Sequence, residues 1–160
     1  MSTITLPEEF KIVDATAGPV TTNGGVTSDY VSVKNAKKAW IVLQFTQAAG
    51  NATVIQPQMA TAVAPTGAAS IAVVMRIWSN LTTAVSDTLV RRTDATSYTL
   101  NADVAKKQVI IEIDIANLPD TYDVIGFTIS NSGQATNFVS GQFFLEAKYQ
   151  AATPPAAITN

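Results

Sequence analysis

Strict alternation of apolar and polar residues is the feature that most limits the fold of this chain. In the stretch QVIIEIDI, residues 108–115, the alternate isoleucines from Ile111 on fall on one side of an extended chain, and Glu112 and Asp114 fall on the other. This period of two residues is that of a β-strand with one buried and one wet face. The stretch GQFFLEAKYQ, residues 141–150, repeats the pattern. Because no long stretch has a helical period, the chain is predicted to be all-β.

Further strand candidates are separated by turn-forming Gly, Asn and Pro residues. The clear ones are AWIVLQFTQ from Ala39, SIAVVMRIW from Ser70 and VIGFTIS from Val124, and the weaker ones lie at 10–14, 29–33, 52–56, 87–93 and 97–100. About eight to ten short strands of this kind predict an antiparallel β-sandwich or jelly roll. A short helix is expected at 102–106, capped by Asn101, and one helical turn within 116–123.

The chain is predicted to have three parts. Residues 1–28 contain a Gly-Pro and an Asn-Gly-Gly break and are expected to form an extended N-terminal arm, which leads into a sandwich domain at 29–150. Residues 151–160 form a C-terminal tail without a charged side chain. This tail has two interpretations: it docks on a partner and presents Ile158, or it folds back over the edge of its own sheet.

Composition excludes several classes of function. The chain of 160 residues has no Cys and no His, which rules out disulfides, thiolate and imidazole metal sites, and catalytic triads. Only 14% of the residues are charged, the net charge is −2, and the cations are scattered, so no nucleic-acid partner is expected. No apolar run is long enough for a membrane span, and the N-terminus does not resemble a signal peptide. We expect a non-enzymatic protein without cofactor or metal, made in the cytoplasm of its producer.

Two acidic clusters are candidate sites, and each also has a structural interpretation. Glu112 and Asp114 share a strand face and could act as an acid and base pair, but a solvated strand face is the preferred interpretation, since the neighbouring segments supply no aromatic platform or third carboxylate. Asp120 and Asp123, with Asn117 nearby, could supply oxygens to a cation. Since the glycine and ligand order of an EF-hand loop are absent, an Asx-turn or a helix cap is the preferred interpretation.

The basic pair Arg91–Arg92, followed by Asp94, suggests an anion site or an ion pair. If the segment is a strand, the two arginines point to opposite faces and cannot form one clamp. We therefore expect at least one of them to form an ion pair within the fold or across a subunit contact.

Aromatic residues suggest an alternative based on sugar binding. Trp40 and Trp78 each flank an apolar strand, and a carbohydrate platform would need them to line one face together with Tyr30 and Tyr122. The structural alternative is that both tryptophans belong to the core or to an interface.

Three stretches together resemble a known group of proteins. They are SDYVSVKNAKKAWIVLQFTQ from Ser28, SDTLVRRTDATSYT from Ser86 and YQAATPPAAITN from Tyr149. In this order they resemble small structural proteins encoded beside the major capsid protein of tailed bacteriophages, a group that includes head decoration or cement proteins. The resemblance implies a virion component without enzymatic activity, which sits on the capsid surface as a homo-oligomer, often a trimer.

The leading hypothesis is therefore a capsid decoration protein that binds the major capsid protein and stabilises the shell. The residues expected to bind partners are Ile4, Leu6 and Phe10 in the arm and Pro154, Pro155 and Ile158 in the tail. Two alternatives are kept: a tail, baseplate or head-fibre component, and a carbohydrate-binding β-sandwich module. Fold class alone does not separate them, since sandwiches carry many functions.

Overall fold

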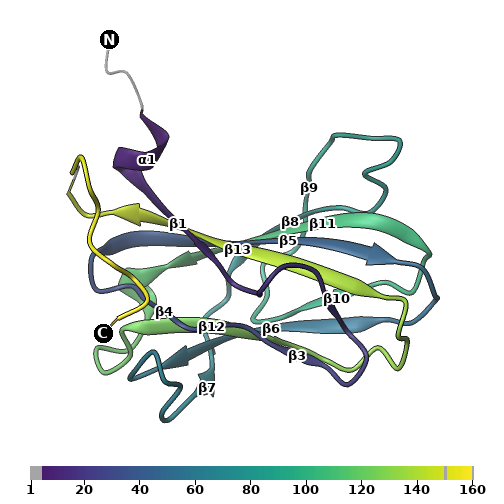
Figure 1. Cartoon of the computed structure of the whole chain (residues 1–160), viewed down its shortest axis with the longest axis horizontal. Coiled ribbons are helices and arrows are strands. Elements are labelled where there is room, and N and C mark those ends of the chain that lie inside the picture. Colours follow the sequence, from purple (N-terminus) through teal and green to yellow (C-terminus); the bar gives the residue numbers. More distant parts are fainter. Residues whose placement is uncertain (1–4, 150, 160) are drawn as a thin grey trace.

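The chain folds into two antiparallel β-sheets packed face to face (Figure 1). The structure is a computed structural model that describes residues 5–149 and 151–159. The prediction of an all-β sandwich is confirmed. Among the described residues, no helix is long and apolar enough to cross a membrane.

The large sheet has seven strands in the order β1-β13-β5-β11-β8-β9, with β2 beside β13. Their bounds are Phe10–Asp14 (β1), Val20–Thr21 (β2), Ala36–Gln47 (β5), Arg76–Asn80 (β8), Val90–Arg91 (β9), Ala105–Asp114 (β11) and Phe138–Ala147 (β13). The three longest strands, β5, β11 and β13, lie next to one another and form the rigid middle of this sheet.

The small sheet has six strands in the order β10-β6-β12-β3, with β4 beside β12 and β7 beside β6. Their bounds are Val26–Thr27 (β3), Val31–Ser32 (β4), Thr53–Ala60 (β6), Ala69–Ser70 (β7), Tyr98–Leu100 (β10) and Val124–Ile129 (β12). One helical turn, α1 (Leu6–Glu9), precedes β1, and a 3-10 turn, η1 (Ile115–Asn117), follows β11.

The core lies between the sheets and is built from alternate residues of the long strands. Ile41, Leu43 and Phe45 of β5 point inward. The rings of Phe127 and Phe143, one from each sheet, meet in the core with their centroids 5.8 Å apart. Gly141 of β13 leaves room for Leu43 and Phe127, because a Cβ at this position would lie 2.7 Å from Leu43 Cδ2 and 3.2 Å from Phe127 Cζ.

The predicted N-terminal arm is largely part of the sandwich, which corrects the boundary at residue 28. Phe10–Asp14 pairs along its whole length with β13, and Val20–Thr21 pairs with the start of the same strand. Val26–Thr27 then pairs with β12 of the other sheet. The glycine and proline breaks are turns between these strands. The backbone groups of the segment are thus satisfied by sheet pairing, as those of a free arm would not be.

The apolar stretch 70–78 is not one strand, contrary to the prediction. It leaves the small sheet at β7 and joins the large sheet at β8, so that residues 71–75 cross between the layers. Ile71 and Met75 are buried during this crossing, while Val74 is 62% exposed. A segment that crosses a core is apolar for the same reason as a buried strand, and the two cannot be told apart by composition.

The helix predicted at 102–106 is absent, since β11 already begins at Ala105. Asn101 does not act as a helix cap. Its side-chain oxygen and its backbone oxygen accept hydrogen bonds from Lys107 Nζ, at 2.6 and 2.8 Å. Lys107 is only 1% exposed and donates a third hydrogen bond to Gln47 Oε1 at 2.8 Å. A buried ammonium group therefore holds the β10–β11 turn to β5.

The described part of the C-terminal tail folds back onto its own domain. Ala157 is buried in the core cluster, and its backbone oxygen accepts a hydrogen bond from the Ser32 backbone N–H at 2.6 Å. Ile158, the next residue, is 65% exposed. The tail closes one end of the sandwich and also leaves an apolar side chain on the surface.

Candidate functional site

The described segments nearest the two chain ends, α1 and the residues after β13, lie at the same end of the sandwich, which we call the terminal end (Figure 1). Phe10 pairs with Glu146, so α1, before Phe10, and the chain after Glu146 leave the large sheet at the same place. Three large apolar side chains are exposed in these segments: Leu6 (48%), Tyr149 (82%) and Ile158 (65%). The three side chains lie on separate segments at the same end of the sandwich, and each is available for a contact with another protein.

The predicted partner-binding residues differ in their accessibility. Leu6 and Pro155 are exposed and Pro154 is half-buried. Phe10 is half-buried, with its ring 5.8 Å from that of Trp40. Ile4 lies outside the described residues. Sequence reasoning missed Tyr149, whose position at the end of an alternating strand suggested that it belonged to the sheet.

Truncation of the tail is expected to separate its two roles. A chain that ends at Ala151 loses buried Ala157 and its hydrogen bond to Ser32, and should lose about 1–2 kcal/mol of unfolding free energy. A chain that ends at Ile158 keeps both and should unfold like the full chain. Urea denaturation of the three chains measures this difference. Equal stability of all three would show that the tail does not contribute to the domain.

The outer face of the large sheet carries an apolar band across five strands. In one row across the strands, Phe144 of β13 is paired with Trp40 of β5 on one side and with Ile12 of β1 on the other. In the next row, Ile110 of β11 is paired with Val42 of β5 and with Trp78 of β8. All six side chains point away from the core and are half-buried or exposed; they are Ile12, Trp40, Val42, Trp78, Ile110 and Phe144. An outer sheet face in water usually carries polar residues.

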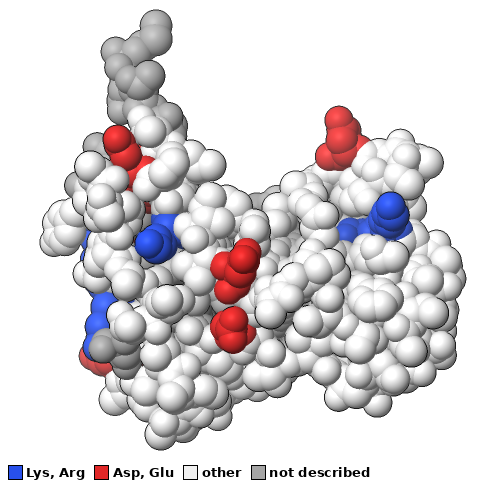
Figure 2. Space-filling model, viewed as in Figure 1, with Lys and Arg blue, Asp and Glu red and all other residues white. Residues whose placement is uncertain are grey.

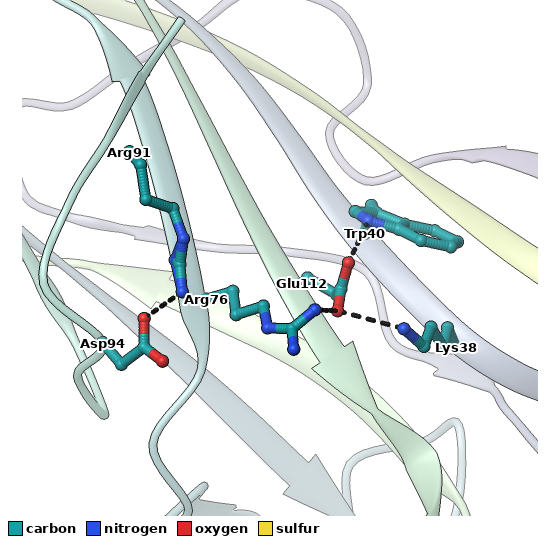
Figure 3. A network of polar contacts seen from close by, with 6 residues as sticks. All are labelled: Lys38, Trp40, Arg76, Arg91, Asp94 and Glu112. Carbon is teal, nitrogen blue, oxygen red and sulfur yellow. Dashed lines mark hydrogen bonds and ion pairs between the residues drawn. The ribbon is translucent and has the colours of Figure 1, made fainter.

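The charges beside the band are paired with one another (Figure 3). Glu112 accepts hydrogen bonds from Lys38 Nζ at 3.2 Å, from Arg76 at 3.4 Å and from the indole N–H of Trp40 at 3.1 Å. Its side chain is 12% exposed, so it is held in a network and is not the solvated residue expected from the sequence. The network fixes the orientation of the Trp40 ring.

A second charge pair covers the other tryptophan. The Arg91 guanidinium lies over the Trp78 ring, 4.8 Å from its centroid, and forms an ion pair with Asp94. Arg92 points the other way and donates to Ser79 Oγ at 2.7 Å. The predicted ion pair within the fold is confirmed, and the two arginines form no common clamp.

A row of uncharged polar side chains continues the outer face beyond the band. Gln108, Gln44 and Ser140 are paired in register on β11, β5 and β13, and none of these side chains has a hydrogen bond to another described residue. Two adjoining hollows, of about 320 and 290 Å³, share Gln44 and Ser140 in their lining. Figure 2 shows the surface hollowed on this side, between the N-terminal segment and the β8–β9 connection.

Two further acidic candidates, Asp123 and Asp114, have partners within the fold. Asp123 forms an ion pair with Lys34 at 3.2 Å, and Asp114 caps η1 through the Ala116 N–H. No group of three His, Cys, Asp or Glu residues that could hold a metal occurs in the described part of the chain. Tyr30 is 7% exposed and Tyr122 packs against the core, so neither joins the two tryptophans.

The apolar band could have been predicted from the run AWIVLQF. Apolar residues at consecutive positions, instead of alternate ones, indicate a strand that is apolar on both faces. The inner face of β5 faces the core and the outer face bears Trp40 and Val42. The pairing with Phe144, Ile110 and Trp78 depends on strand order, which the sequence alone does not specify.

Comparisons with known proteins add little. No protein-family model matches the chain, and no curated protein matches it. A solved structure described as "Structure of infectious bursal disease virus Gx strain" is similar over 91% of this chain and 41% of that chain, at 13% identity and a TM-score of 0.18. The chain thus spans less than half the length of that chain. A similarity of this degree carries no argument about function.

Proposed function

We propose that this protein is a non-catalytic structural component of a tailed-phage head, a decoration protein that attaches to the outer shell through its terminal end. The observation that carries the proposal is the exposure of Leu6, Tyr149 and Ile158 in the segments that leave the sandwich at this end. The resemblance of three stretches of the sequence to phage decoration proteins supplies the partner, the major capsid protein.

The physical features of the chain suit this role. A low content of charge means that few ions lose their hydration when the surface contacts another protein. If several copies assemble, as the resemblance implies for a trimer, modest contacts made together raise the total affinity by orders of magnitude. The long antiparallel strands supply a rigid body between the contacts.

Attachment to particles tests the proposal. We expect Leu6→Asp and Ile158→Asp to weaken binding to undecorated heads about tenfold or more, because each places a charge in an apolar contact. Melting of the isolated domain should not change. The matched control is Val85→Asp, because Val85 is 85% exposed and lies in the β8–β9 connection, away from the terminal end.

The copy number in purified virions decides between the virion alternatives. We expect a number of the same order as that of the major capsid protein, measured by quantitative mass spectrometry. A few copies per particle would favour a tail, baseplate or fibre component. Absence from the particle, or equal binding by all three aspartate variants, would contradict the proposal.

A further inference from the structure

The apolar band on the outer face of the large sheet is too small by itself for a stable contact between two protein domains. Neighbouring strands lie about 4.8 Å apart and residues on one face repeat about every 7 Å, so the apolar band covers roughly 20 Å by 10 Å. A specific protein interface needs about 800 Å² from each partner. A band of roughly 200 Å² fits a smaller occupant.

The chemistry of the face also limits the occupant. The nearby charges of Lys38, Arg76 and Glu112 satisfy one another, as do those of Arg91 and Asp94. A charged ligand at the apolar band would have to break these pairs. Beside the hollows, the uncharged side chains of Gln44, Gln108 and Ser140 have no hydrogen-bond partner among the described residues and can both donate and accept. Lys106, which is exposed and has no ion pair within the described part of the chain, also lines the larger hollow.

Trp40 is held as a fixed aromatic surface beside these groups. Its N–H is bound to Glu112, and Phe10 packs against its ring. On the outer face of β5, Trp40 is followed by Val42, which lines the smaller hollow, and then by Gln44, which lines both hollows. Their volumes, about 320 and 290 Å³, are close to the lower limit of about 300 Å³ for small-molecule sites. Trp78 differs from Trp40, because Arg91 covers its ring.

We propose that this face binds a neutral oligosaccharide, which lies along β5 with one sugar against Trp40 and its hydroxyl groups bonded to Gln44 and Ser140. Sugars combine an apolar face of C–H groups with hydroxyls that donate and accept hydrogen bonds. On the outer face of β5, Trp40 and Val42 offer an apolar surface and Gln44 offers an amide that donates and accepts. Fixing of the Trp40 ring before binding reduces the entropy that a ligand must overcome. This activity is independent of attachment through the terminal end.

The two tryptophans of the chain allow the site to be located by fluorescence. The full chain is titrated with a panel of neutral oligosaccharides made of glucose, mannose, galactose or N-acetylglucosamine. We expect at least one of them to shift the Trp emission of the wild type and of Trp78→Phe, in which Trp40 is the remaining reporter. The shift should be absent from Trp40→Phe.

The amide is tested separately. Gln44→Ala should weaken binding of the same sugar about tenfold, the equivalent of one lost hydrogen bond of about 1.4 kcal/mol. The control is Gln58→Ala, because Gln58 lies on the other sheet and bonds Ser70 there. Circular dichroism should show that the variants are folded.

Three results would overturn the inference. The first is that no sugar in the panel shifts the emission or is retained on an immobilised sugar column. The second is that binding survives both Trp40→Phe and Gln44→Ala. The third is a dimer in sedimentation equilibrium that Val42→Asp dissociates, which would show that a second copy of the chain covers this face.

Discussion

Replacing Lys107 with Ala is expected to lower the free energy of unfolding by about 3 kcal/mol. The change empties the space of a long buried side chain, and it leaves Gln47 Oε1 and both oxygens of Asn101 without their donor. Relief of the desolvated charge offsets part of this loss. Urea denaturation followed by Trp fluorescence measures the result.

Two further variants identify the source of the loss. Lys106, the adjacent residue, is exposed, so Lys106→Ala should change stability by less than about 0.5 kcal/mol. Lys107→Met keeps most of the apolar stem and removes the donor, and it should fall between the two. If Lys107→Met were as stable as the wild type, the three hydrogen bonds would contribute nothing net.

Lys107 should also be visible in the dependence of stability on pH. Burial lowers the pKa of Lys107 below its ordinary value of 10.5, with a smaller opposing effect from the Asp103 charge. Between the folded pKa and 10.5 the unfolded chain holds more protons, so this residue makes stability rise with pH in that window. Burial raises the pKa of Tyr30 above 10.0, which has the opposite effect from about pH 10 upward. The difference between the wild type and Lys107→Met isolates the lysine, because Tyr30 is common to both.

Gly141→Ala is expected to cost about 2–3 kcal/mol, because the added methyl group would enter a filled core. It would lie 2.7 Å from Leu43 Cδ2, 3.2 Å from Phe127 Cζ and 3.5 Å from Ala15 Cβ. The closest neighbour, Leu43, lies in the same sheet and Phe127 lies in the other, so relief requires both side chains to move within a packed core. The midpoint of thermal unfolding should fall accordingly.

A double-mutant cycle tests whether Leu43 is the main obstacle. Leu43→Val removes the nearest carbon and alone should cost about 1 kcal/mol. Combined with Gly141→Ala, the total loss should be smaller than the sum of the two single losses. Strict additivity would mean that the strain arises at Phe127 or Ala15 instead.

The parts of the fold that follow from local patterns could be predicted from the sequence. Strands β11 and β13 alternate over many residues, β5 contains a long apolar run, and β1 coincides with the predicted stretch 10–14. The prediction of one strand at 70–78 was wrong, because a segment that crosses the core between two sheets and a buried strand are both rich in apolar residues. The prediction of a free N-terminal arm was wrong, because the strand with which it pairs, β13, lies more than a hundred residues away in the sequence and local patterns do not reveal such a pairing.

The same distinction holds for the candidate sites. The sequence placed Glu112 and Asp114 on one face of a strand, as found, but it could not supply Lys38 and Arg76, which come from the flanking strands β5 and β8. Trp40 and Trp78 were considered together on account of their chemistry alone. The two tryptophans lie on the same face because of the strand order. Arg91 covers the Trp78 ring because β9 pairs with β8.

The neighbouring position of β1 and β13 has a mechanical consequence. Since both chain ends leave the sandwich at one end, a force that pulls them apart first acts on the contact between Ala157 and Ser32, and then opens the β1–β13 pairing from Phe10 and Glu146 onward. The hydrogen bonds of the ladder are then loaded one pair at a time and not all together, so the chain resists such a pull weakly. Tension in an assembly is better borne across the faces of the sheets than through the two ends of the chain.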